Sequence, residues 1–85
     1  MIELSVIIPA EGEPDAGAAV GRVARAVAAL GCAAEILCVT PEPQLAGLPA
    51  DAGVTCVPPS GPGYGAALAS GFAQARGTWV LTIDA

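Results

Sequence analysis

The sequence predicts an α/β domain built on an open, mostly parallel sheet of the Rossmann-like kind, with helices on both faces. Short apolar runs rich in β-branched residues alternate along the chain with longer stretches whose apolar residues recur at helical spacing. The short runs are nearly continuous, which is typical of parallel strands that are buried on both faces. Strands that alternate with helices are joined by right-handed crossovers, so we expect parallel pairing throughout.

The first strand and the first helix are expected in the amino-terminal third of the chain. Residues 4–9 form a β-branched run that Pro9 ends, and a polar turn follows with Asp15 as a candidate N-cap. Residues 16–30 carry an apolar stripe at helical spacing, and Gly31 is typical of the position just after a helix. This part of the sequence therefore predicts a strand, a tight turn and an amphipathic helix.

The remainder of the chain predicts three more strands and a second helix. The strands are expected at residues 35–40, 54–57 and 78–84, and the helix at residues 64–76, where a glycine ends it. A weaker pattern within residues 44–51 allows a short additional helix.

The chain of 85 residues allows one domain at most, residues 1–85. So short a chain buries only about 60–65% of the surface that its unfolded form exposes, so its core is expected to be marginal. The predicted core consists of apolar residues on the strands and on the inner stripes of the helices. Its members are Val6, Ile7, Ile8, Val20, Val23, Val27, Leu30, Ile36, Leu37, Val39, Leu68, Phe72, Val80, Leu81 and Ile83.

The charge balance argues against a nucleic-acid partner. The chain has no lysine and three arginines against eight acidic residues, which gives a net charge of -5. Surfaces that bind nucleic acids need clustered Lys and Arg side chains to neutralise the phosphates.

The cysteines argue against a zinc site. Cys32, Cys38 and Cys56 are widely spaced, and the chain has no histidine. An odd number of cysteines at apolar positions predicts reduced, buried thiols in a reducing compartment. The sequence shows no signal-peptide pattern and no apolar run of about 20 residues. We therefore expect a cytoplasmic protein, which segments beyond this chain could hold at the cytoplasmic face of a membrane.

Acidic residues follow three of the four predicted strands. Glu11 and Glu13 follow the first strand, Glu42 follows the second, and Asp84 ends the fourth. The carboxyl ends of parallel strands meet at one edge of a sheet, where open α/β sheets bind their ligands. Each of these acids can equally be a solvated loop residue. Asp84 differs because it ends an apolar strand, where a carboxylate is costly unless it binds a ligand or a metal.

The glycines before the second predicted helix also fit a dinucleotide-binding pattern. Gly61, Gly63 and Ala66 match G-x-G-x-x-A between a strand and a helix, and Asp84 lies 18 residues past Ala66. Residues 58–60 separate the strand from the first glycine, however, and the proline between the two glycines lacks an N–H for phosphate. The alternative is that the glycines allow a tight loop and close packing of the helix on the sheet.

Four stretches of the chain resemble family 2 glycosyltransferases, which have the GT-A fold, and most closely their polyprenol-phosphate (dolichyl-phosphate) mannosyl- and glucosyltransferases. L-S-V-I-I-P-A with Glu13 resembles the family opening S-V-V-I-P-A-Y-N-E, and V-x-R-x-V-x-A-L and A-E-I-L-x-V follow in order. G-Y-G-A-A-L-x-x-G-F-x-x-A-R-G resembles the family's helix after the third strand, and W-V-L-T-I-D-A resembles the strand that leads into its D-x-D motif. The resemblance implies the strand order 3-2-1-4 and an incomplete domain, truncated at the D-x-D motif.

The resemblance also implies a nucleotide-sugar site with a divalent metal. The residues that match the family's nucleotide-sugar-binding positions are Pro9, Ala10, Glu13, Val39, Asp84 and Ala85. Asp84 matches the first residue of D-x-D and is the expected metal ligand, for Mg²⁺ or Mn²⁺ together with residues downstream of this chain. A hard cation of this kind takes carboxylate and phosphate oxygens as ligands.

The chain departs from the family pattern at two places. Glu11 and Gly12 stand where the family has Tyr and Asn. Residues 40–43, T-P-E-P, stand where the family has D-D-G-S, so the acid expected to hold the base is absent at its position. These departures support the alternative of a degenerate, non-catalytic nucleotide-binding or regulatory module.

The resemblance implies a fragment of an inverting, nucleotide-sugar-dependent glycosyltransferase. The donor would be of the GDP-mannose or UDP-glucose class, and the acceptor a polyprenol phosphate or a similar lipid phosphate. No catalytic residue is expected within the chain, so the fragment alone should be inactive. A third alternative is an NAD(P)-binding Rossmann unit. The fourth strand would lack its next neighbour, so we expect the fragment to associate with itself.

Overall fold

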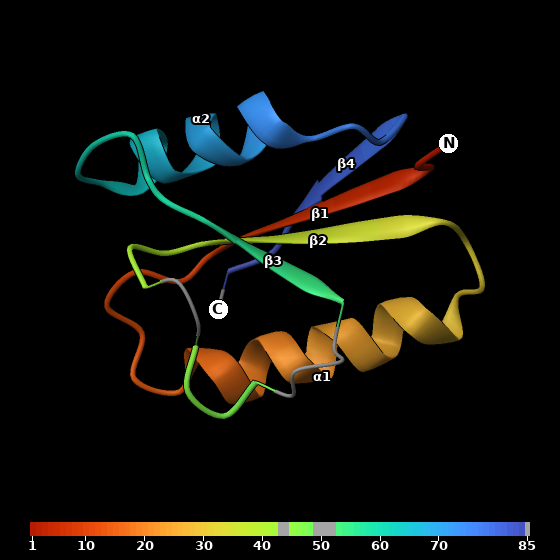
Figure 1. The fold of residues 1–85 in the computed structure, drawn as a ribbon, viewed down its shortest axis with the longest axis horizontal. Helices are drawn as coiled ribbons and strands as arrows, with labels where there is room; N and C mark the ends of the chain where they lie inside the picture. Colours follow the sequence, from red (N-terminus) through yellow and green to blue (C-terminus); the bar gives the residue numbers. More distant parts are fainter. Residues whose placement is uncertain (43–44, 49–52, 85) are drawn as a thin grey trace.

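The computed structural model describes residues 1–42, 45–48 and 53–84, and the strands of these residues form one parallel sheet. The elements are β1 (Leu4–Pro9), α1 (Ala16–Ala29), β2 (Ala34–Val39), β3 (Val54–Val57), α2 (Tyr64–Gln74) and β4 (Trp79–Thr82). The strand order is β3-β2-β1-β4. Helix α1 covers one face of the sheet and α2 covers the other (Figure 1). The predicted class, strand order and placement of helices are confirmed.

Strand β1 is one of the two inner strands of the sheet and pairs with both β2 and β4. Its Val6 and Ile8 point into the layer under α1, whereas Ile7 points into the layer under α2. Val6 and Ile7 are fully buried. The nearly continuous apolar run of residues 4–9 therefore reflects burial on both faces, as the sequence predicts.

The two sides of the sheet carry separate hydrophobic clusters. The larger cluster lies between the sheet and α1, where Val20 and Val27 of the helix meet Ile36 and Cys38 of β2. The smaller cluster lies under α2 and contains Ile7, Leu37, Val39, Val57 and Ala67. More of the buried apolar residues therefore lie on the α1 side, which is the side of the longer helix.

Helix α2 packs on the sheet through small residues. Ala67 and Gly71 are buried, and a Cβ added to Gly71 would collide with Cγ2 of Ile7. The helix consequently lies close to β1, and its bulkier side chains are turned to the flank. Leu68 packs at the margin of the cluster, while Phe72 is 51% exposed.

Four residues of the predicted core are exposed instead: Leu30, Phe72, Val80 and Leu81. Leu30 lies just beyond α1, at its C-cap, and so leaves the stripe that faces the sheet. Val80 and Leu81 belong to β4, which is an edge strand whose residues are all exposed. Periodicity identifies an apolar strand but does not reveal whether a neighbouring element covers it. The predicted self-association through this edge stays a prediction.

The element ends differ from the prediction in several details. Strand β2 covers Ala34–Val39 instead of residues 35–40, and β4 covers Trp79–Thr82 instead of residues 78–84. Asp15 precedes α1 but makes no side-chain capping bond, whereas Gly31 has the left-handed conformation expected after the helix, with φ of 73°. Helix α2 ends at Gln74, before the predicted glycine, because Ala75 is already extended. Gly77 instead passes against β1, where an added Cβ would lie 2.6 Å from the backbone nitrogen of Ser5.

The predicted short helix within residues 44–51 falls largely outside the described residues. Its described part, residues 45–48, is a turn in which the Leu48 N–H donates to the Leu45 carbonyl at 3.3 Å. Leu45 is buried in the cluster under α1. Over the described ranges, neither helix has the length and apolar character needed to cross a bilayer.

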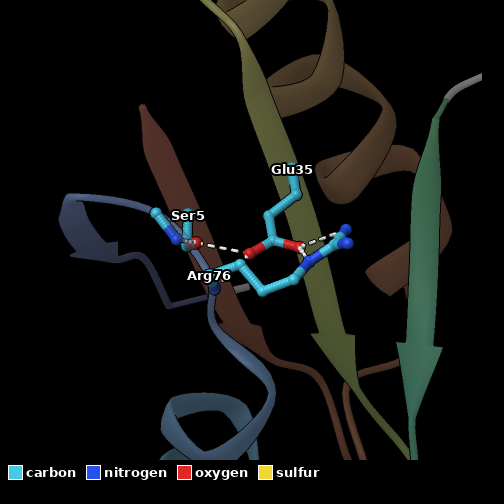
Figure 2. A network of polar contacts seen from close by, with 4 residues as sticks. Ser5, Glu35 and Arg76 are labelled. Carbon is cyan, nitrogen blue, oxygen red and sulfur yellow. Dashed lines mark hydrogen bonds and ion pairs between the residues drawn. The ribbon is translucent and has the colours of Figure 1, made fainter. Parts of the chain in front are cut away.

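A polar network joins β1, β2 and the α2–β4 connection at the amino ends of the strands (Figure 2). The Ser5 hydroxyl donates to Glu35 Oε2 at 2.6 Å and accepts from the Gly77 N–H at 2.8 Å. The Arg76 backbone N–H donates to the same carboxylate oxygen at 2.7 Å. The Arg76 guanidinium reaches Oε1 from Nε at 3.3 Å and from Nη2 at 3.2 Å. One carboxylate thus holds three segments that are far apart in the sequence.

These contacts determine the ionisation of Glu35, whose side chain is only 10% exposed. Burial by itself raises the pKa of the carboxyl group. The hydrogen bonds from Ser5 and Arg76, with the guanidinium charge, outweigh burial and hold the pKa below the ordinary value of 4.5. The ionised form is therefore the form that stabilises the fold.

We predict that Glu35→Gln lowers the free energy of unfolding at pH 7 by about 1–3 kcal/mol, because charge-assisted hydrogen bonds are lost. The folded-state pKa lies below the unfolded value, so the carboxylate's contribution is present above pH 4.5 and disappears as the pH falls through the folded-state value. Urea unfolding across this pH range should show that the difference in the free energy of unfolding between the parent chain and the variant decreases as the pH is lowered. Glu42→Gln, at an exposed side chain, serves as the control. Equal stabilities of the Glu35 variant and the parent at pH 7 would contradict this role.

Candidate functional site

A hollow of about 370 Å³ lies at the carboxyl edge of the sheet, opposite the Glu35 network. It is formed by the turn after β1, the start of α2 and the residues after β4. The lining residues are Pro9, Glu11, Glu13, Gly63, Tyr64, Ala67 and Asp84. The edge is the one at which open parallel sheets bind their ligands.

The turn between β1 and α1 presents two carboxylates to the hollow. The Ala10 N–H donates to the Val39 carbonyl at 3.0 Å, which continues the pairing of β1 with β2. The Glu13 N–H then donates to the Ala10 carbonyl at 3.3 Å, and Gly12 takes a φ of 78°. A left-handed residue at this point is what allows the chain to reverse. The turn therefore exposes Glu11 and Glu13 just after the buried part of β1.

Helix α2 begins at the hollow. Gly63 precedes it with a φ of 94°, and no side chain caps the helix amino end. The first helical bond runs from the Ala67 N–H to the Gly63 carbonyl at 3.1 Å. Earlier N–H groups of a helix have no partner within the helix, and they carry partial positive charge. The amino end of α2 is thus the part of the lining that favours an anion.

Asp84 is held at the hollow by the strand before it and by a tyrosine. The Ile83 N–H donates to the Ile7 carbonyl at 3.0 Å, which keeps the chain parallel to β1 beyond the end of β4. The Tyr64 hydroxyl then donates to Asp84 Oδ1 at 2.9 Å. This hydrogen bond, with some desolvation and the charge of Asp84, raises the pKa of Tyr64 above the ordinary value of 10.0.

The structure brings together only some of the predicted site residues. Pro9, Glu13 and Asp84 line the hollow. Ala10 and Val39 are buried, in the α1-side and α2-side clusters respectively, and have no place in its lining. Ala85 lies outside the described residues. Their roles in binding a nucleotide-sugar stay predictions.

Sequence reasoning missed the contribution of α2 to the hollow. Tyr64 and Ala67 line it without a role predicted from the sequence, and Gly63 was considered only within the dinucleotide-binding alternative. The signal was present in the G-Y-G-A-A stretch, which starts a helix after a strand end. The position of Tyr64 beside Asp84 depends on β4 lying next to β1, which no local pattern encodes.

The lining is acidic, with three carboxylates and no basic side chain. Among the described residues, no three or more His, Cys, Asp or Glu side chains are grouped so that they could hold a metal ion. The carboxylate oxygens have the right chemistry for Mg²⁺ or Mn²⁺, but they do not form a preassembled site. A cation here would need further oxygens, such as those of a phosphate ligand.

The topology does not favour the dinucleotide-binding alternative. In a dinucleotide-binding unit, the strand before the glycines and the strand after the helix belong to one βαβ pair. Here β3 and β4 lie at opposite edges of the sheet, separated by β2 and β1. Gly61 also has no need to be a glycine for packing, since an added Cβ would meet Ala66 at an ordinary 3.9 Å.

Comparison with protein-family models, with curated proteins and with solved structures found no match to this chain. Function is therefore inferred from the fold, the hollow and the sequence motifs alone.

We predict that the pKa of Tyr64 falls toward 10.0 in an Asp84→Ala variant, since its partner and the neighbouring negative charge are both removed. The chain has a single tyrosine, so titration of the phenolate by ultraviolet absorbance reports this side chain alone. Glu3→Gln, at the opposite edge of the sheet, should leave the titration unchanged. An unaltered midpoint in Asp84→Ala would mean that the two side chains are not in contact in solution.

Proposed function

We propose that this chain provides the nucleotide-sugar-binding part of an inverting glycosyltransferase of the GT-A type. The observation that carries the proposal is the meeting of Pro9, Glu13 and Asp84 in one hollow. They come from the S-V-I-I-P and W-V-L-T-I-D stretches that resemble family 2 glycosyltransferases. The strand order β3-β2-β1-β4 agrees with the order implied by that resemblance.

The proposed ligand is a nucleoside diphosphate sugar of the GDP-mannose or UDP-glucose class, bound with Mg²⁺ or Mn²⁺. Asp84 would contribute a carboxylate oxygen to the cation, and Tyr64 would hold that carboxylate in place. The amino end of α2 would direct N–H groups at the diphosphate. When bound, the cation neutralises charge on the departing nucleoside diphosphate.

The cation would also counter the repulsion between the carboxylates of the hollow and a diphosphate ligand. Three carboxylates line the hollow, and a bare diphosphate would be repelled by them. A divalent cation held by Asp84 would offset this repulsion and would make phosphate oxygens favourable partners. Binding of the nucleotide should therefore depend strongly on the metal.

Transfer would proceed by direct displacement at the anomeric carbon. The acceptor oxygen forms the new bond as the bond from the anomeric carbon to the diphosphate oxygen breaks, which inverts the configuration. A lipid phosphate acceptor, such as a polyprenol phosphate, is already anionic and needs little help from a base.

A non-catalytic nucleotide-binding module is the second candidate, and the turn after β2 favours it. Thr40 is buried, and its Oγ1 accepts the Glu42 N–H at 3.2 Å, so this turn closes on itself. Glu42 does not line the hollow. The turn thus offers no carboxylate to a base at the position where the family has an acidic pair. The two candidates differ in catalysis and agree on binding.

Calorimetric titration with UDP-glucose and with GDP-mannose, each with and without Mn²⁺, tests the proposal. We predict metal-dependent binding of one of them, weakened at least about tenfold in Asp84→Ala, since the loss of one charged ligand costs at least about 1.4 kcal/mol. Glu3→Gln is the charge-matched control and should bind as the parent does. Because neither candidate predicts hexose transfer by this chain alone, donor binding is the deciding readout. No binding of either donor, or equal binding by Asp84→Ala, would contradict both.

A further inference from the structure

Strands β2 and β3 carry a pair of cysteines in matching register. Cys38 of β2 is paired with Cys56 of β3, and both belong to the side of the sheet that α1 covers. Neighbouring strands lie about 4.8 Å apart. This spacing falls within the roughly 4.4–6.8 Å between Cα atoms that a disulfide spans.

The two cysteines occupy paired positions on the same side of the sheet and differ in access. Cys38 is fully buried, whereas Cys56 is partly exposed on the edge strand. Burial, with the charge and hydrogen bond of the neighbouring Cys56, raises the pKa of Cys38 to about 12. A reagent from solvent would therefore reach Cys56 first, and Cys38 would react only with a sulfur already beside it.

The third cysteine is separated from this pair. Cys32 lies in the connection before β2 and lines a small hollow beside α1, together with Val27 and Ala34. It precedes Cys38 by six residues. From Ala34 to Cys38 the strand rises about 3.3 Å per residue, roughly 13 Å over four residues, and Cys32 lies before the start of that strand, so Cys38 is too far for a disulfide. Cys32 therefore serves as an internal control, a thiol that should not join an intrachain disulfide with Cys38.

We propose that Cys38 and Cys56 form an oxidation-sensitive pair, which a low-molecular-mass disulfide converts into an intrachain disulfide between β2 and β3. The Cys56 thiolate attacks one sulfur of the reagent, forming a mixed disulfide and releasing one thiolate. The Cys38 thiolate then attacks the Cys56 sulfur and releases the second thiolate. The two protons lost by the protein thiols end on the two released thiols, so one disulfide is reduced as one is formed.

The consequence is a covalent tie at the sheet edge away from β4. Strand β3 has four residues and pairs only with β2 in the described sheet. A bond between Cys38 and Cys56 would fix this short strand to its neighbour, so the oxidised chain should melt at a higher temperature than the reduced chain. This inference is independent of the proposed nucleotide site.

Incubation of the native chain with oxidised glutathione, followed by intact-mass measurement and thiol titration, tests the pair. The three free thiols should fall to one, in a monomer lighter by two hydrogens. Cys32→Ser should lose both of its remaining thiols in the same way. Proteolytic cleavage before Asp15, Asp51 and Asp84 places Cys38 and Cys56 on separate peptides, 15–50 and 51–83. In the oxidised Cys32→Ser chain these two peptides should stay joined until the disulfide is reduced.

The variant Cys56→Ser should keep Cys38 reduced, since no neighbouring sulfur is left for it to attack. Three outcomes would overturn the proposal. The Cys32→Ser chain could retain both thiols, it could stop as a glutathione adduct, or it could form a disulfide between two chains instead of within one.

Discussion

The structure depends on the pairing of one strand, β1, with a parallel neighbour on each side. The register of β1 with β2 and with β4 determines how far each neighbouring strand extends along the carboxyl edge of the sheet. Because Ile7 and Val6 are buried on opposite faces, β1 cannot slip by one residue without exposing one layer and burying the wrong side chains in the other. Glu13, at the end of the turn after β1, and Asp84, after β4, meet as a result of this register.

The two edges of the sheet are opposite in character. At the amino edge, the carboxylate of Glu35 is paired with a guanidinium and with N–H and O–H donors. At the carboxyl edge, three carboxylates line an open hollow whose lining has no basic side chain, and the Tyr64 hydroxyl donates to one of them. Arg22 and Arg25 lie exposed on α1 and are not part of that lining. The first edge is internally neutralised and serves stability. The second has charge left to bind a cation, which is the property that a metal-dependent nucleotide site requires.

Much of the fold could be predicted from local patterns, because the periodicity of apolar residues in a strand or a helix is a property of residues close together in the sequence. Residues 4–9 and 54–57 were predicted with the observed bounds, and the parallel order followed from the family resemblance. The exposure of β4 could not be read from its apolar sequence, since burial depends on which element lies beside it. The small-residue face of α2 was missed for a related reason. In the sequence, Gly71 only lowers the helix propensity of its segment. Its role becomes clear in the structure, where Ile7 occupies the space that a Cβ at position 71 would need.

The polar sites were harder to predict than the fold. The Glu35 network joins residues that are between 30 and 72 positions apart, so no spacing rule identifies it. The same holds for Tyr64 with Asp84 and for Cys38 with Cys56, each of which depends on strand order and register. The carboxylates at the strand ends were predictable, because parallel strands place their carboxyl ends together whatever the details of packing. Ala10 and Val39, which were predicted from the family resemblance, lie near strand ends and yet are buried, so their roles in the site stay predictions.

The central claim is that the strand ends form one rim that binds a diphosphate through a divalent cation. Paramagnetic broadening of backbone amide signals by Mn²⁺, with and without UDP or GDP and with Mg²⁺ as the diamagnetic reference, tests it most directly. With the nucleotide present, the signals of Glu13, Gly63 and Asp84 should broaden, while those of Glu35 at the opposite edge should persist. Broadening centred away from the hollow, or broadening that does not depend on the nucleotide, would contradict the account.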